Sequence, residues 1–185
     1  VGNYLRYQGK AQFGPGSLSH DVINVMAEYG VVPESAYSGL PNGDERHNHG
    51  QMDAVLEGIA EALVKNNRGN LNPSWSRAVD GVLDAYLGEV PENFDVGGKN
   101  YTPTEYRDRL GLKSEDYVSF SSFTHHPFYE SFVLEVPDNF SQGSFYNIPI
   151  EAMLSMTEVA LRSGYTVAWD ADVSEAGFSF SNGMA

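Results

Sequence analysis

The chain has 185 residues, 41% hydrophobic and 12% aromatic, which is enough apolar material for the core of one domain or a large part of one. Its formal net charge of −14 repels phosphate backbones and disfavours nucleic-acid binding. The lack of cysteine excludes disulfides, thiolate zinc sites and an internal thiol nucleophile, and no stretch approaches the roughly 18 apolar residues of a membrane span.

A short helix is predicted after the glycine-rich residues 1–17. Ser19 is expected to cap this helix, which should end near Gly30. The residues of its apolar face are Val22, Ile23 and Met26. A long polar connection is then predicted from Pro33 to Gly50, because prolines, glycines and charged residues gather there.

Three further helices are predicted between residues 50 and 112. The first carries apolar residues at the three- and four-residue spacing of one helix face, namely Met52, Val55, Leu56, Ile59, Ala60, Leu63 and Val64. The second follows Asn72 and Pro73, a cap and a first-turn proline, and ends at Gly88. Its buried face is expected to contain Trp75, Val79, Val82, Leu83 and Tyr86. The third runs from the capping box TPTE (residues 102–105) to Gly111.

The pattern changes to strands from Tyr117. Residues 117–123 and 131–136 are aromatic and β-branched, which is typical of strands. A helix from Pro149 to Gly164 should present Ile150, Met153, Leu154, Thr157 and Leu161 on one face. Residues 166–169 are predicted to form a buried strand that ends at Asp170 and Asp172. Helices thus precede strands, which favours an α+β fold.

Four blocks occur in order along the chain. The first is GPGSLSHDVIN (residues 14–24) with YGVVPE (29–34), and the second is LDAYLGEVPENF (83–94) with YTPTEY (101–106). The third is FTHHPFYE (123–130) with VPDNF (136–140) and YNIPI (146–150), and the fourth is GYTVAWDADVS (164–174). Together these blocks resemble the papain-like cysteine peptidases, in the branch of bleomycin hydrolase and bacterial aminopeptidase C.

The resemblance implies that residues 1–185 are the central part of one papain-like peptidase domain. Residues 50–112 would be the helical insertion of this branch, and residues 113–185 a strand-rich part leading toward the catalytic histidine. The family cleaves N-terminal residues with a cysteine thiolate, a histidine and an asparagine, and a glutamine stabilises the oxyanion. In family order these residues precede residue 1 or follow residue 185. The segment is therefore expected to contain no catalytic residue and to be inactive by itself.

The resemblance also places substrate-binding residues on this chain. The family's Gly-Gly pair, which binds the substrate backbone in an extended form, maps to Gly16 and Ser17. Ser17 departs from glycine and is expected to crowd the groove, and Leu18 should line the second specificity pocket. Trp169 and Asp170 are expected near the opposite wall, where an acidic side chain attracts the free α-amino group of a peptide.

Further implications concern partners and compartment. The partners implied are peptide substrates, the remainder of the same protein and, in the intact enzyme, five other copies in a homo-hexamer; no cofactor, metal, nucleic acid or membrane is expected. The family favours the cytoplasm. Because the sequence begins at Val1, a periplasmic or secreted protein with a removed leader fits as well.

Other interpretations of the sequence remain open. A non-catalytic peptide-binding or structural relative of the same fold is the main alternative, and a complete gene encoding Cys, His and Asn in family order would argue against it. A metal-dependent hydrolase using His47 and His49 is a weaker one, since no third ligand is evident. The consecutive residues 19–21 (SHD) cannot form a catalytic relay because neighbouring helical side chains diverge. His125 and His126 are expected to be a hydrogen-bonded structural pair.

Overall fold

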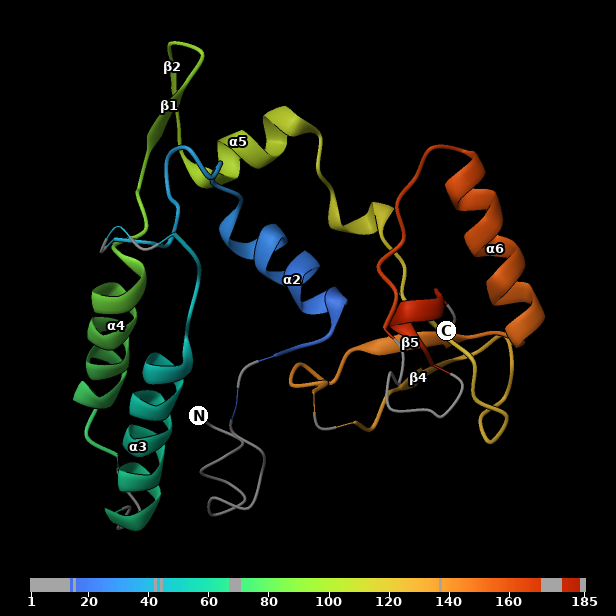
Figure 1. Cartoon of the computed structure of the whole chain (residues 1–185), viewed down its shortest axis with the longest axis horizontal. Coiled ribbons are helices and arrows are strands. Elements are labelled where there is room, and N and C mark those ends of the chain that lie inside the picture. Colours follow the sequence, from blue (N-terminus) through green and yellow to red (C-terminus); the bar gives the residue numbers. More distant parts are fainter. Residues whose placement is uncertain are drawn as a thin grey trace.

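The computed structural model in Figure 1 describes residues 14, 16–41, 43, 45–66, 71–136, 138–170 and 178–183. Helices dominate the first half of this part of the chain and a small sheet lies in the second, so the fold is mixed α+β, as predicted. The elements are α2 (Ser19–Tyr29), α3 (Gly50–Asn66), α4 (Ser74–Leu87), β1 (Phe94–Val96), β2 (Lys99–Tyr101), α5 (Pro103–Leu110), η1 (Ser114–Asp116), β3 (Phe120–Ser121), β4 (Ser131–Val133), β5 (Ser144–Asn147), α6 (Ile150–Arg162) and η2 (Phe180–Asn182).

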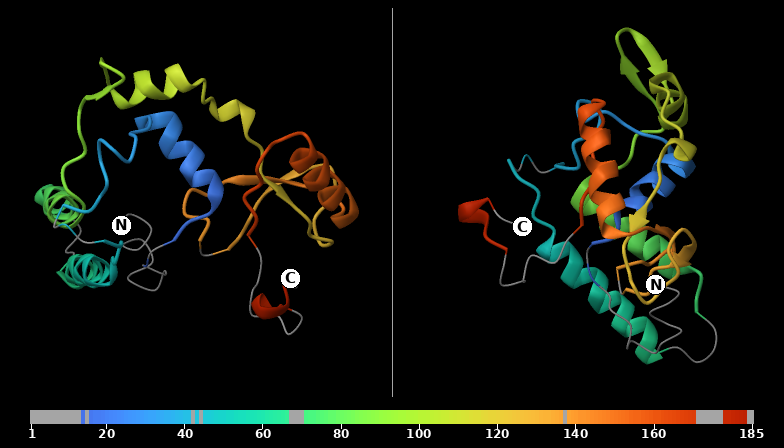
Figure 2. Two further views of the ribbon diagram at one scale, coloured as in Figure 1. Left: turned by 45° about the horizontal axis from the view of Figure 1, so that its top comes forward. Right: turned by 90° about the vertical axis from the view of Figure 1, so that its right-hand side faces the viewer.

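Helices α3 and α4 lie side by side at one end of the molecule, and the sheet with α6 lies at the other end (Figure 1). Helices α2 and α5 lie between these two ends, and Figure 2 shows the resulting arch from two more directions. No helix in the described part of the chain is long and apolar enough to cross a bilayer.

Helix α2 (Ser19–Tyr29) ends where predicted but begins one residue earlier than expected. Leu18, not Ser19, is the N-cap residue, and no side chain caps the helix there. The prediction that Ser19 caps the helix was wrong, because Ser19 already belongs to the first helical turn. The predicted end at Gly30 is confirmed.

The end of α2 packs tightly against the start of α5. The backbone N–H of Val31 donates to the carbonyl oxygen of Pro103 at 3.0 Å, and Arg107 Nη1 donates to the carbonyl oxygen of Ala27 at 2.6 Å. A Cβ on Gly30 would lie 2.2 Å from the carbonyl carbon of Pro103. A glycine is therefore needed where the two helices meet.

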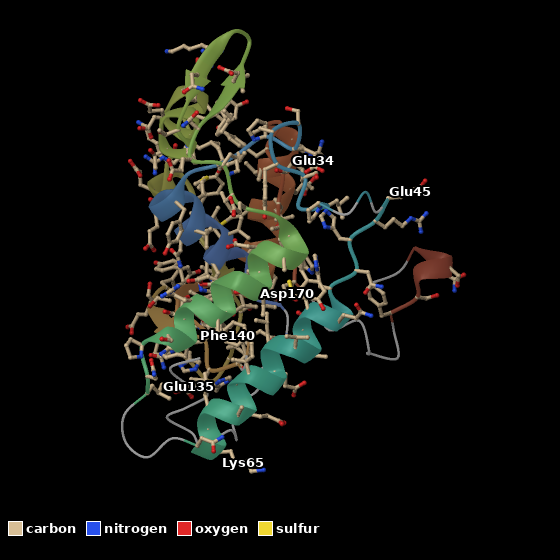
Figure 3. All side chains as sticks on the ribbon, turned by 90° about the vertical axis from the view of Figure 1, so that its left-hand side faces the viewer. Glu34, Glu45, Lys65, Glu135, Phe140 and Asp170 are labelled. Atoms are coloured by element: carbon tan, nitrogen blue, oxygen red, sulfur yellow. The ribbon has the colours of Figure 1, made fainter. Side chains whose placement is uncertain are left out.

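The predicted helices between residues 50 and 112 are all present. Pro73, not Asn72, is the N-cap residue of α4, and no side chain of that residue caps the helix, so the predicted cap and first-turn proline are each shifted by one residue. Asn72 Oδ1 accepts from the backbone N–H of Ser74 at 2.9 Å. On the predicted apolar faces of α3 and α4, Met52 and Ala60 are buried, Val55 is exposed and the other residues are half-buried. The long connection before α3 contains no helix or strand among its described residues, and Glu34 and Glu45, labelled in Figure 3, lie exposed on it.

The hairpin of β1 and β2 was not predicted from the sequence. Its antiparallel strands pair Phe94 with Tyr101, and both side chains are buried against the ring of Tyr106. Both hydrogen bonds of the predicted capping box are present at the start of α5. The Thr102 hydroxyl accepts from the backbone N–H of Glu105, and the Glu105 carboxylate accepts from the backbone N–H of Thr102. This part of the sequence specifies its structure through contacts a few residues apart.

The three-stranded sheet has the order β3-β5-β4, with β5 parallel to β3 and antiparallel to β4. The strands predicted at residues 117–123 and 131–136 are present in shortened form, as β3 and β4. The central strand β5 was missed. Side chains on β5 alternate little in polarity, and its partners come from segments far from it in sequence.

The predicted strand at residues 166–169 is wrong. Residues 165–170 form no strand, and Tyr165 and Trp169 are 71% and 53% exposed. A strand requires a partner for its backbone groups, and no described strand lies alongside this segment. Asp172 lies outside the described residues.

The predicted face of α6 is only partly buried. Met153 and Thr157 are half-buried, whereas Ile150, Leu154 and Leu161 are exposed. The buried apolar side chains of the described residues are Met26, Met52, Ala60, Phe94, Tyr101 and Ile148. This core is small, and large apolar side chains are exposed on several elements.

Candidate functional site

The segment before α2 presents an open backbone edge, formed by Gly16, Ser17 and Leu18. Gly16 has a φ of 105°, which is accessible to glycine and strained for other residues. Leu18 is extended, with φ −83° and ψ 156°. Gly16 and Ser17 are exposed, and their backbone groups make no hydrogen bond with another described residue. An extended peptide could pair with such an edge.

The side chain of Ser17 is directed toward α2. Its Oγ donates a hydrogen bond to Oδ2 of Asp21, one turn into the helix. The Asp21 side chain is 19% exposed, and its Oδ1 lies 3.5 Å from Asn24 Nδ2. Partial burial raises the pKa of Asp21, but hydrogen bonds from Ser141, Ser17 and Asn24 and the charge of His20 outweigh burial and lower the pKa below its usual value.

His20 connects α2 to the turn before β5. Its Nε2 lies 2.8 Å from Ser141 Oγ and 3.5 Å from Asp21 Oδ1, and its ring meets the ring of Phe145 edge-on. A Cβ on Gly143 would lie 2.3 Å from His20 Nε2, so the turn needs glycine at this position. Sequence reasoning missed this contact because Ser141 and His20 are 121 residues apart.

The Ser141, His20 and Asp21 side chains do not form a catalytic relay. In a relay, one ring nitrogen receives the serine proton and the other donates to the carboxylate. Here Ser141 and Asp21 both lie near Nε2, and the buried Nδ1 of His20 has no hydrogen-bond partner among the described residues. The cluster therefore holds elements together rather than activating a nucleophile.

A hydroxyl-rich groove of about 330 Å³ lies beside this cluster. It separates α2 from the sheet, and no carboxylate or ammonium group lines it. Its lining residues are His20, Ile23, Asn24, Ser114, Tyr117, Val118, Ser119, Ser131, Gly143, Ser144 and Tyr146.

Trp169 and Asp170, the other predicted substrate-binding residues, lie on the exposed segment after α6, and Asp170 is labelled in Figure 3. Among the described residues, no hydrogen bond or ion pair connects them with the edge at residues 16–18. A shallow apolar hollow of about 380 Å³ on α6 and the turn after it is lined by Ser155, Met156, Val159, Ala160, Ser163 and Tyr165. Within the described ranges, no helix or strand packs extensively against α6.

The histidine pairs form ring contacts. The rings of His47 and His49 are 5.4 Å apart, and no group of three or more His, Cys, Asp or Glu side chains that could hold a metal occurs within the described ranges. His126 stacks on Phe132 with ring centroids 4.0 Å apart, and His125 lies 4.5 Å from His126. In the part of the chain that the structure describes, ring contacts connect the second pair to each other and to Phe132, and the predicted side-chain hydrogen bonds are not formed.

Neither a scan against protein-family models nor a search of curated proteins finds a match for this chain. The geometry around residues 16–21 and the exposed apolar surface after α6 are therefore the features from which a function can be inferred.

Proposed function

We propose that this chain is the central segment of a papain-like cysteine aminopeptidase of the bleomycin hydrolase branch. In the whole protein, a cysteine thiolate attacks the carbonyl carbon of the first peptide bond and expels the shortened peptide as the amine, with a proton from the catalytic histidine. Water then hydrolyses the acyl-enzyme and releases the N-terminal amino acid. Cysteine, histidine and asparagine come from parts of the protein outside residues 1–185.

The open edge at Gly16 and Ser17 carries this proposal. Its backbone groups have no partner among the described residues. It directly precedes α2, which is hydrogen-bonded to Ser141 near its start and to Pro103 and Arg107 at its end. Such an edge binds an extended substrate through main-chain hydrogen bonds, which do not depend on the substrate's side chains. In the proposed enzyme, Leu18 contributes to the pocket for the second substrate residue.

The exposed apolar surface supports the proposal that this chain is a segment of a larger protein. Val159 and Tyr165 are exposed on the hollow beside α6, and Trp169 follows on the next exposed segment. Single exposed apolar residues are common, whereas a continuous group of them marks a contact surface. The remainder of the same protein is the partner proposed here, and the resemblance extends the proposal to a homo-hexameric ring.

The acidic character of the chain supports a substrate with a free amino terminus. The formal net charge is −14, and Asp170 is exposed on the segment proposed as the opposite cleft wall. A carboxylate at that place attracts the protonated α-amino group and disfavours blocked substrates.

The test uses protein produced from the complete gene. Hydrolysis of aminoacyl amides and of the same compounds with an acetylated amino group is measured before and after thiol alkylation, with the intact mass recorded under denaturing conditions. We expect one alkylated cysteine, loss of activity on alkylation and preference for free amino termini. A protein without a reactive thiol that still binds peptides would favour the non-catalytic relative instead.

A further inference from the structure

We infer that Asp21 is a positioning residue of the substrate edge, which draws the Ser17 hydroxyl onto α2 and keeps the backbone of Gly16 and Ser17 open for an extended peptide. The inference rests on the proposed function, because it assigns this edge to peptide binding. It also revises the expectation that Ser17 crowds the groove, since the Ser17 side chain is already bonded to the helix.

A serine at this place competes with the substrate when its hydroxyl is free. Serine side chains readily hydrogen-bond neighbouring backbone groups, which are the groups that a peptide must reach. A carboxylate is a stronger acceptor for the hydroxyl than a neutral backbone oxygen. Bonding of Ser17 to Asp21 therefore removes a local competitor, and glycine at this position would need no such partner.

Asp21 is well placed for this role because other side chains fix it. His20 Nε2 lies 3.5 Å from one carboxylate oxygen, and His20 is in turn held by Ser141 from the turn before β5. The position in the first turn of α2 also favours a negative charge, because backbone N–H groups point toward it. The lowered pKa of Asp21 is in agreement with an ionised acceptor at neutral pH.

Helix capping alone is the competing explanation for this contact. Leu18 provides no side-chain cap, so an Asp21 that binds Ser17 also stabilises the start of α2. Capping predicts a loss of stability on substitution and no change in substrate affinity. Positioning predicts a change in KM that requires the Ser17 hydroxyl.

The test is a double-mutant cycle in the whole protein, with Asp21→Asn, Ser17→Gly and the double variant. We expect Asp21→Asn to raise KM for peptides about tenfold with kcat little changed, in keeping with the loss of one charge-assisted contact. In the Ser17→Gly background, the same substitution should leave KM within about twofold. The matched control is Asp53→Asn in the first turn of α3, whose KM should equal that of the wild type.

Two results would overturn the inference: an equal rise in KM in both backgrounds, or a lower melting temperature with KM unchanged. A second measurement does not depend on a folded Asp21 variant. NMR titration should show a higher pKa for Asp21 in Ser17→Gly than in the wild type, and an unchanged pKa would contradict the contact.

Failure of the proposed chemistry is recognisable separately. If the wild-type protein binds extended peptides without cleaving them, the aminopeptidase proposal fails. The double-mutant cycle is then measured through the Kd for the peptide, and we expect the same fold-changes in Kd as those given for KM. If the wild-type protein binds no peptide, both proposals are overturned.

Discussion

Asn147 and Phe123 hold each other through two hydrogen bonds: the Phe123 N–H donates to Asn147 Oδ1 at 2.8 Å, and Asn147 Nδ2 donates to the Phe123 carbonyl at 2.9 Å. The same amide nitrogen lies 3.0 Å from the carbonyl oxygen of His126 and 3.1 Å from that of Pro127. The Asn147 side chain is fully buried, so these backbone groups depend on it in place of water. The loop between β3 and β4 is thereby tied to β5.

Replacing Asn147 with alanine should destabilise the protein strongly. The substitution removes the side-chain partner of the part-buried Phe123 N–H and of the carbonyl groups of Phe123, His126 and Pro127, and we expect a loss of about 2–3 kcal/mol in the free energy of unfolding. Urea unfolding of the whole protein measures it. The control is Asn100→Ala on the exposed hairpin, which should cost about 0.5 kcal/mol or less. Similar losses for both variants would contradict this account of Asn147.

Gly143→Ala should separate α2 from the turn before β5. The new Cβ would lie 2.3 Å from His20 Nε2, so the His20–Ser141 bond must break or the turn must move. We expect a destabilisation of about 1–3 kcal/mol. Gly58→Ala in α3 is the matched control, because its Cβ would meet no atom within 4 Å and helix propensity predicts stabilisation of about 0.5–1 kcal/mol. The contact would be disproved if both variants melted at or above the wild-type temperature.

The contribution of Asp21 to stability should depend on acid pH. Its pKa is lowered on folding from the usual value of 3.8, so ionised Asp21 stabilises the folded state above pH 3.8. This contribution falls as the pH drops below 3.8 and is lost below the folded-state pKa. The difference in unfolding free energy between wild type and Asp21→Asn should therefore be constant near neutral pH and shrink in acid. If the difference in unfolding free energy grew in acid, the stabilisation of the folded state by ionised Asp21 would be disproved.

Asp170→Asn in the whole protein should raise KM for substrates with a free amino terminus. An exposed charge pair contributes about 1 kcal/mol or less, so we expect a rise of roughly twofold to fivefold. Acetylated substrates should show no change, because they lack the positive charge. Asp95→Asn on the β1–β2 hairpin serves as the control. Unchanged kinetics with both substrate types would remove Asp170 from the substrate site.

Residues 1–185 expressed alone should have little independent stability. Exposed apolar side chains such as Val159, Leu161 and Trp169 need a partner surface, and the buried core of the described residues is small. We expect dye binding to exposed apolar surface and a broad thermal transition. A cooperative, reversible melt would show that the segment folds by itself.

The sequence determined the local elements well. The apolar spacing of α3, the end of α4 at Gly88 and the Thr102–Glu105 capping box were all predicted correctly. Each depends on residues within about four positions of one another, so their geometry follows from backbone periodicity and hydrogen bonding that the sequence displays directly.

Only the tertiary structure decided the remaining features. Strand β5 exists because β3 and β4 pair with its two sides, and the segment before Trp169 remains unpaired because no described strand lies beside it. The bond from Ser17 to Asp21 lies within one helical turn, but its anchoring depends on Ser141, 121 residues from His20. Strand pairing and side-chain anchoring of this kind depend on which distant segments contact each other in the folded chain, and local sequence periodicity does not specify those contacts.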